Sequence, residues 1–196
     1  MKKIPPHTQV PLVFLAVLAL GFFLLMTLPE TKKEKEEDVP IGGPFTLLDS
    51  AGVTRTNADF PGQYLLVFFG YTFCPDVCPI TLQTVGSALD RLGKQAEKVT
   101  PIFITVDPER DTPERMGKYV SSFHPRLVGL SGSNEQIAAV AKAYRVYYAK
   151  SGEDEDYLLD HSAILFFMSP DGRYLAHFRS DDSAEKMAAG MSGFLE

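Results

Sequence analysis

The chain contains two cysteines, Cys74 and Cys78, which lie three residues apart in the segment Gly70-Tyr-Thr-Phe-Cys-Pro-Asp-Val-Cys-Pro79. A thiolate is both a nucleophile and a soft metal ligand. The pair therefore predicts either a redox centre or part of a metal site. A structural disulfide is a third interpretation, but a bridge that closes so small a loop restricts the unfolded chain only a little.

The four histidines are the other candidate ligands. His7 precedes a long apolar run, and His124 lies at the end of an expected helix. His177 lies in an expected hairpin, where a half-exposed strand residue is the default. His161 differs, because it comes directly before a buried strand and can project from a loop at one end of a sheet. Taken alone, its position still favours a structural role.

Two thiolates and one imidazole, from Cys74, Cys78 and His161, would form a soft to intermediate ligand set. Such a set suits Cu(I) in a three-coordinate site and tolerates Cu(II) with an added ligand. A closed zinc site usually has four protein ligands, and the sequence offers no convincing fourth. Copper is therefore the preferred metal.

Three acidic residues, Asp76, Asp107 and Asp160, are expected near this site. Each could orient His161, tune the thiolates or attract a cation. Each could equally be a helix cap or a turn residue, and this simpler interpretation is favoured.

The cysteines lie between two elements that would position them. The apolar run at 64–70 predicts a central strand that is covered on both faces. An apolar stripe of helical period follows to about Gln95, with Pro79 expected at the first helical position. The sulfurs would lie at the carboxyl end of a strand and the amino end of a helix. Ligands of α/β folds gather there, and free N–H groups favour the thiolate.

The rest of the chain predicts strands that alternate with helices. Asp111 or Thr112 would cap one helix, Ser133 with Gln136 the next, and Asp181 or Asp182 the last. This order predicts parallel pairing, with antiparallel strands added by the last hairpin. The fold class is α/β, a thioredoxin-like three-layer sandwich with an added N-terminal hairpin. Strands are expected at 99–106, 127–130 and 145–149, helices at 113–123, 133–144 and up to 194, and hairpins at 44–56 and 163–178.

The amino-terminal segment carries an uncharged apolar run from Val10 to Leu28. Nineteen helical residues span about 28 Å, close to the hydrocarbon thickness of a bilayer, so one transmembrane helix is expected. No small-residue cleavage site follows, which argues against a signal peptide. Lys2 and Lys3 favour a cytoplasmic amino end. The expected divisions are a cytoplasmic end at 1–9, an anchor at 10–28, a charged linker at 29–40 and a folded domain at 41–196.

Composition limits the function classes. The chain has 196 residues with 45% hydrophobic content, enough for one domain with a core of its own. Two cysteines do not make a disulfide scaffold. The net charge of −6 argues against nucleic acid as a partner.

Three segments together resemble the Sco/SenC family of copper-binding cytochrome c oxidase assembly proteins. They occur in the same order as the family's cysteine motif, second signature and histidine segment. In this sequence they are Gly70-Tyr-Thr-Phe-Cys-Pro-Asp-Val-Cys-Pro79, Val106-Asp-Pro-Glu-Arg-Asp-Thr-Pro-Glu114, and Asp160-His-Ser162 with Ser169-Pro-Asp-Gly172.

The resemblance implies that Cys74, Cys78 and His161 bind one copper ion. It also implies a role in maturing the binuclear copper centre of cytochrome c oxidase subunit II, with copper received from a periplasmic donor. The expected location is the bacterial inner membrane, with the folded domain in the periplasm. The alternative is the mitochondrial inner membrane, with the domain facing the intermembrane space.

Two functions remain open at this point. A metallochaperone, which is not an enzyme, would pass copper to a partner and is favoured. A thiol-disulfide oxidoreductase would instead reduce the copper-ligand cysteines of the target through Cys74 and Cys78. The spacing argues mildly against a general reductase, because C-x-x-C is the usual motif there. Peroxidase activity is a weaker third interpretation, which requires sulfenate chemistry at one cysteine.

Overall fold

The computed structural model describes residues 40–152 and 156–195. The expected anchor at 10–28, the linker up to residue 39 and three residues of the expected acidic turn, 153–155, lie outside the described residues. Among the residues that are described, no helix has the length and apolar character needed to cross a membrane.

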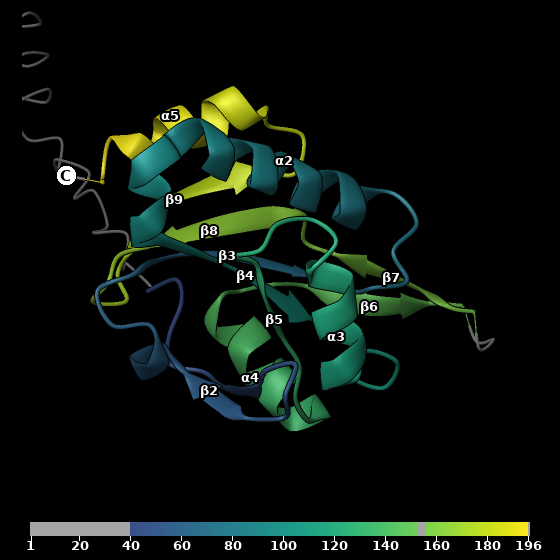
Figure 1. Cartoon of the computed structure of the whole chain (residues 1–196). Helices are drawn as coiled ribbons and strands as arrows, with labels where there is room; N and C mark the ends of the chain where they lie inside the picture. The colour runs from purple at the N-terminus through teal and green to yellow at the C-terminus, as the bar shows by residue number, and fades with distance from the viewer. Residues whose placement is uncertain (1–39, 153–155, 196) are drawn as a thin grey trace, which may run out of the picture. The chain divides into compact units, whose positions relative to one another are not determined.

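The domain is built on a mixed five-stranded sheet in the order β5-β4-β3-β8-β9 (Figure 1). The first three strands pair in parallel, and the last two are antiparallel, as the strand–helix alternation and the final hairpin predicted. The central position of β3 is also confirmed, with six of its seven residues buried. The strands are β3 (Tyr64–Gly70), β4 (Val99–Thr105), β5 (Val128–Leu130), β8 (Ile164–Met168) and β9 (Tyr174–Arg179).

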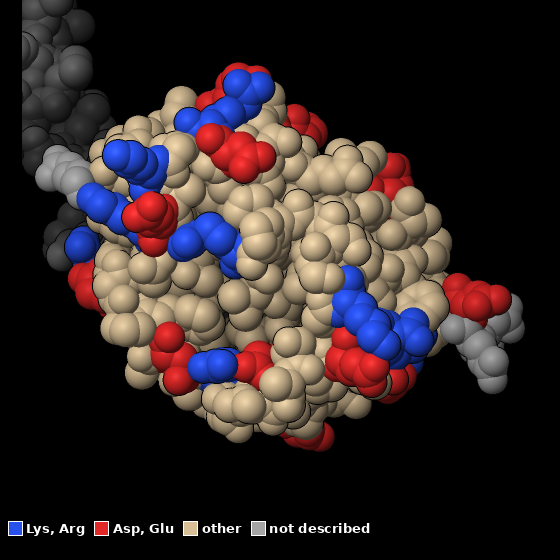
Figure 2. Space-filling view, viewed as in Figure 1, with Lys and Arg blue, Asp and Glu red and all other residues tan. Residues whose placement is uncertain are grey.

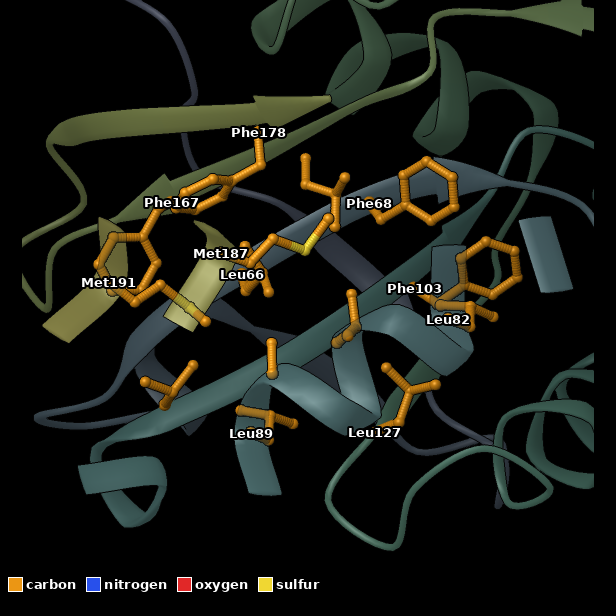
Figure 3. Packing of buried hydrophobic residues seen from close by; sticks show 14 of the residues in the cluster. Leu66, Phe68, Leu82, Leu89, Phe103, Leu127, Phe167, Phe178, Met187 and Met191 are labelled. Carbon is orange, nitrogen blue, oxygen red and sulfur yellow. The ribbon is translucent and has the colours of Figure 1, made fainter. Parts of the chain in front are cut away.

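Side chains of β3 alternate between two hydrophobic clusters, one on each face of the sheet. Leu66 and Phe68 belong to one cluster, and Leu65, Val67 and Phe69 to the other. Figure 3 shows the first cluster, in which side chains of the strands meet those of the helices. The first face is covered by α2 (Val77–Leu92), α3 (Pro113–Val120) and α5 (Ala184–Ser192), and the second by α4 (Asn134–Ala143) with β1 (Thr46–Leu48). The predicted three-layer sandwich is confirmed.

Two small hairpins stand beside the main sheet. The expected N-terminal hairpin consists of β1 and β2 (Thr54–Thr56), and a bridge from Leu48 to Ser131 ties it to the end of β5. The second hairpin pairs β6 (Tyr148–Ser151) with β7 (Leu158–His161). The expected strand at 145–149 begins too early, because Arg145 has φ 56° and belongs to a turn.

The start of α2 corrects one prediction. The helix begins at Val77 with Asp76 as its N-cap, two residues before the expected first position at Pro79. Proline fits anywhere in the first turn, because the N–H groups there have no partner within the helix. Cys78 therefore lies inside the helix rather than on the loop before it. The helix ends at Leu92, short of the expected end near Gln95, and a 3₁₀ turn follows.

Helix caps were predicted with mixed success. The capping box of Ser133 and Gln136 is confirmed at α4. Thr112, not Asp111, caps α3, since its side chain accepts a hydrogen bond from the backbone of Arg115. The prediction of Asp181 or Asp182 for α5 is wrong, because Ser183 is the cap there. The neighbouring acidic residues instead pair with basic side chains.

Charged side chains of both signs are interspersed on the face shown in Figure 2, with uncharged areas between them. Exposed ion pairs of the domain include Arg91 with Glu185 and Lys118 with Glu114. Exposed pairs of this kind contribute at most about 1 kcal/mol each. The stability of the domain therefore comes mainly from the two buried clusters.

Candidate metal centre

The two cysteines meet where β3 ends and α2 begins. Cys74 lies on the connecting loop and is half-buried, whereas Cys78 is fully buried in the first turn of the helix. The backbone N–H of Cys78 donates a hydrogen bond to the sulfur of Cys74 at 3.4 Å. A free N–H at a helix start is well suited to stabilise a thiolate. The predicted loop position between strand and helix is confirmed for Cys74, whereas Cys78 lies in the first turn of the helix.

His161 reaches the cysteines from the β6–β7 hairpin. It is the last residue of β7, so the expectation that it projects from a loop is wrong. Its ring packs near those of Phe68 and Tyr71, with ring centroids 6.2 and 5.9 Å away. Pairing with Tyr148 of β6 fixes the backbone at this position. The strand was missed because its pairing partner lies across the acidic turn.

The tautomer of His161 follows from its contacts. Nδ1 lies 3.3 Å from the backbone oxygen of Ser162, which can only accept a hydrogen bond. Nδ1 therefore carries the hydrogen, and the lone pair of Nε2 is free to bind a metal. Nε2 lies 3.5 Å from the sulfur of Cys78. A carbonyl that holds one ring nitrogen in this way is the usual support of a metal-binding histidine.

The three candidate ligands converge. The sulfurs of Cys74 and Cys78 and a ring nitrogen of His161 all lie within 4.8 Å of one another. In a trigonal site with bonds of about 2.3 Å, the donor atoms lie about 4.0 Å apart, so a closure of less than about 1 Å is needed. Within the described part of the chain, this group has three members. The donor set fits a soft, three-coordinate ion.

The two sulfurs differ in protonation. A hydrogen bond from the Cys78 thiol lowers the pKa of Cys74 to about 3, against the effect of burial. The pKa of Cys78 is raised by the same hydrogen bond to Cys74 and by its own burial. The metal-free centre therefore holds one thiolate, at Cys74, and one thiol. Metal binding has to release the proton of Cys78.

Alkylation should reveal this difference. We expect iodoacetamide to modify Cys74 at a nearly constant rate from about pH 5 to 8, because its thiolate is already formed. An ordinary thiol loses about tenfold in rate for each pH unit below its pKa. Mass spectrometry of the alkylated peptides would measure this, with urea-unfolded protein as the control. A tenfold decrease per pH unit at Cys74 in the folded protein would contradict the assignment.

The three acidic residues expected near the ligands do not join the ligand group. Asp76 is exposed at the start of α2, and Asp160 is exposed on β7. Asp107 is buried and pairs with Arg110 at 2.5 Å. It also accepts a hydrogen bond from the hydroxyl of Tyr157 at 2.7 Å. Asp107 therefore fixes the positions of the Arg110 and Tyr157 side chains.

Two of the remaining histidines, His124 and His177, lie outside the ligand group, as expected. His124 accepts a hydrogen bond from the backbone of Arg126 beyond the end of α3. His177 lies on β9, where its ring contacts the hydroxyl of Tyr174. His7 lies outside the described residues.

Arg110 joins the two segments that carry the ligands, and the sequence reasoning missed it. Its guanidinium lies 4.5 Å from the ring centroid of Phe73 and 3.6 Å from that of Tyr157. Phe73 directly precedes Cys74, and Tyr157 directly precedes β7. Arg110 lies in the segment 106–114 that resembles the family's second signature, but that segment assigned it no role. No spacing rule connects residues this far apart.

Replacement of Arg110 by methionine should lower the free energy of unfolding by about 3 kcal/mol, because it leaves Asp107 buried without its ion-pair partner. Urea unfolding would measure this. Arg115→Met is the matched control, since Arg115 also lies over the ring of Phe73, at 4.7 Å, but is exposed. Equal effects of the two substitutions would show that the buried ion pair is not what matters.

Comparisons with known proteins show the family of this chain. The model of the SCO1/SenC family matches residues 33–196, so the chain belongs to that family. The human protein SCO1 homolog, mitochondrial, is 40% identical over 189 residues, which cover 89% of this chain and 63% of that protein. The chain therefore spans less than two thirds of the length of this human relative.

Two solved structures are similar over the folded domain, which has a thioredoxin-like fold. ScoI of Bradyrhizobium japonicum with copper bound is 47% identical, with a TM-score of 0.73, and the match covers 79% of this chain and 99% of that one. ScoI of Arabidopsis thaliana with copper bound is 40% identical, also with a TM-score of 0.73, over 78% of this chain and 96% of that one.

Proposed function

We propose that this protein is a copper chaperone that holds one copper ion between Cys74, Cys78 and His161. The observation that carries the proposal is the convergence of these three donors within 4.8 Å. Two thiolates and an imidazole suit Cu(I), and a zinc site would usually require a fourth protein ligand. The bound copper in the two similar ScoI structures supports the choice of metal.

The position of the site suits transfer of the ion to another protein. Cys74 and His161 are only half-buried, so a ligand of a target can approach from outside. Phe73, Val77 and Ile80, next to the cysteines, present exposed apolar surface. Copper would move by ligand exchange, in which a target thiolate binds the ion as a chaperone ligand leaves. Three-coordinate copper leaves room for this exchange.

The acceptor in this proposal is cytochrome c oxidase subunit II, at its binuclear copper centre, as the family resemblance implies. A periplasmic protein would supply the copper. The run at 10–28 would anchor the chain once in the bacterial inner membrane, with the copper domain in the periplasm. The corresponding location in mitochondria would be the inner membrane, facing the intermembrane space.

A second function, thiol-disulfide exchange, is favoured by one observation, the low pKa of Cys74 beside the thiol of Cys78. The thiolate of Cys74 would attack a disulfide of the target and form a mixed disulfide, releasing one target thiolate. Cys78 would then attack Cys74, which releases the second target thiol and leaves the pair oxidised. The target gains two electrons, and the chaperone cysteines lose them. A disulfide between Cys74 and Cys78 would not bind copper.

The test is an anaerobic titration of the reduced, full-length chain with Cu(I) against a competing chelator, in detergent. The wild type is expected to bind one ion per chain tightly. The variant Cys74→Ser/Cys78→Ser is the control and is expected to bind none. Absence of binding by the reduced wild type would contradict the chaperone proposal. A mixed disulfide with the target, trapped by Cys78→Ser, would then favour the exchange reaction.

A further inference from the structure

Asp111 is a fully buried acidic residue that the proposed function leaves without a role. Its carboxylate accepts hydrogen bonds from the backbone N–H of Thr72 at 2.9 Å and from the hydroxyl of Thr72 at 2.5 Å. The hydroxyl of Thr105 donates a third at 2.7 Å. These donors are all neutral groups. Keeping a buried carboxylate charged with only neutral donors costs desolvation free energy. The burial of Asp111 therefore calls for an explanation.

The position of Asp111 connects it with the metal centre. Thr72 lies two residues before Cys74, on the loop that follows β3. Thr105 is the last residue of β4, and Ser131, just after β5, donates a hydrogen bond to the backbone oxygen of Asp111 at 2.6 Å. The side chain and backbone of Asp111 thus tie together the ends of three parallel strands. The ligands lie at this same edge of the sheet.

The hydrogen bonds favour the ionised form of Asp111. The oxygen of the Thr105 hydroxyl already accepts from the backbone N–H of Asp107, so its hydrogen is free to point to the carboxylate. The N–H of Thr72 can only donate. The net effect is a raised pKa of Asp111, mainly because of its burial and with a smaller contribution from Asp107, and the donors from Thr72 and Thr105 limit this rise. Because the carboxylate binds Thr72, two residues before Cys74, its charge lies next to the loop that carries this ligand.

We infer that Asp111 is a positioning residue whose fixed negative charge, buried behind the cysteine loop, biases the metal centre toward Cu(II) relative to Cu(I). This inference rests on the proposed copper site. With the same ligands, Cu(II) carries one more positive charge than Cu(I). A buried anion therefore stabilises the Cu(II) form more, because solvent screens it weakly. The hydrogen bonds to Thr72 serve a second, geometric purpose, since they hold the loop in front of Cys74.

The variant Asp111→Asn separates charge from shape. An amide oxygen in place of Oδ2 keeps the bonds from the N–H of Thr72 and the hydroxyl of Thr105, and the amide NH₂ can donate to the hydroxyl of Thr72. Thr72→Val is the converse control, because it removes one hydrogen bond and keeps the charge. Asp111→Ser is a second neutral variant for the case in which the asparagine protein does not fold.

The experiment measures Cu(I) and Cu(II) affinities of the full-length protein by chelator competition. Asp111→Asn should weaken Cu(II) by about tenfold more than Cu(I), the order expected of one partly screened buried charge. Thr72→Val should change both affinities by the same factor. Ag(I) and Cd(II), which do not oxidise thiols, give the same comparison of charges and should show the same difference.

The outcomes separate this inference from the function on which it rests. Equal losses of Cu(I) and Cu(II) affinity in Asp111→Asn, with wild-type binding intact, would overturn the charge role and leave the copper site standing. A wild type that binds neither ion would overturn the proposed function and this inference together.

Discussion

A chain that carries His161→Ala is expected to bind Cu(I) more than about 100-fold less tightly than the wild type. The substitution removes one of three ligands, and loss of even an outer-shell partner of a ligand costs roughly 10- to 100-fold. Both cysteines remain, so weak two-coordinate binding should persist. Chelator competition with the reduced, full-length protein would measure the change.

Two controls separate loss of a ligand from loss of packing. His177→Ala removes a histidine from the surface of β9 and should leave Cu(I) affinity unchanged. The ring of His161 packs near those of Phe68 and Tyr71, so its removal leaves a space. Added imidazole should enter this space and restore part of the affinity. Rescue of this kind is expected of a ligand and not of a side chain that only packs.

The same variant distinguishes the two proposed functions. Thiol-disulfide exchange depends on the thiolate of Cys74 and the thiol of Cys78, and it should survive in His161→Ala with a modest change in rate. Copper transfer to a target should be lost. Equal Cu(I) affinity of the wild type and His161→Ala would remove His161 from the site and leave a redox thiol pair as the better account.

The parts of the fold that the sequence predicted well are those encoded by local patterns. The apolar run of β3 is too long and too hydrophobic for an edge strand, and the structure places it at the centre. The capping box of Ser133 and Gln136 needs only residues three apart, so its chemistry is visible in the sequence. The same is true of the cysteine loop, which lies between two strongly patterned elements.

Errors arose where several polar residues compete for one position. Asp111 and Thr112 are both good caps by type, but tertiary contacts bury Asp111 between Thr72 and Thr105. Only Thr112 is then left to cap α3. The burial of a carboxylate among residues so distant in sequence has no local signal. Cap propensity therefore limited the candidates to Asp111 and Thr112, and the burial of Asp111 left Thr112 as the cap of α3.

The sequence analysis named the three candidate ligands, but not the elements and side chains that hold them in place. The family resemblance gave His161, whereas its residue type and position alone favoured a structural role. His161 lies on a hairpin whose two short strands pair across the acidic turn. Strands this short show no clear alternation of apolar and polar residues in the sequence. The contacts of Arg110 with Phe73 and Tyr157 are likewise non-local. Ligand types can be read from a sequence more readily than the groups that hold them.

Gly70→Ala is expected to damage both the fold and the site, although it adds only one methyl group. A Cβ at Gly70 would lie 2.5 Å from the sulfur of Cys78 and 2.7 Å from a ring carbon of Phe103. Cys78 and Phe103 are both fully buried, so neither can move aside freely. Overpacking of this kind costs about 1–3 kcal/mol. Relief by a shift of Cys78 would also move its sulfur away from Cys74 and His161.

Urea unfolding and Cu(I) competition on the same samples would measure the two effects of Gly70→Ala. Gly193→Ala is the matched control, because no atom lies within 4 Å of an added Cβ there. Loss of both stability and copper affinity is expected for Gly70→Ala alone. A Gly70→Ala protein with wild-type values of both would show that the sulfur of Cys78 can relocate. In the structure, the absence of a side chain at the end of β3 is what lets that sulfur lie directly against the central strand.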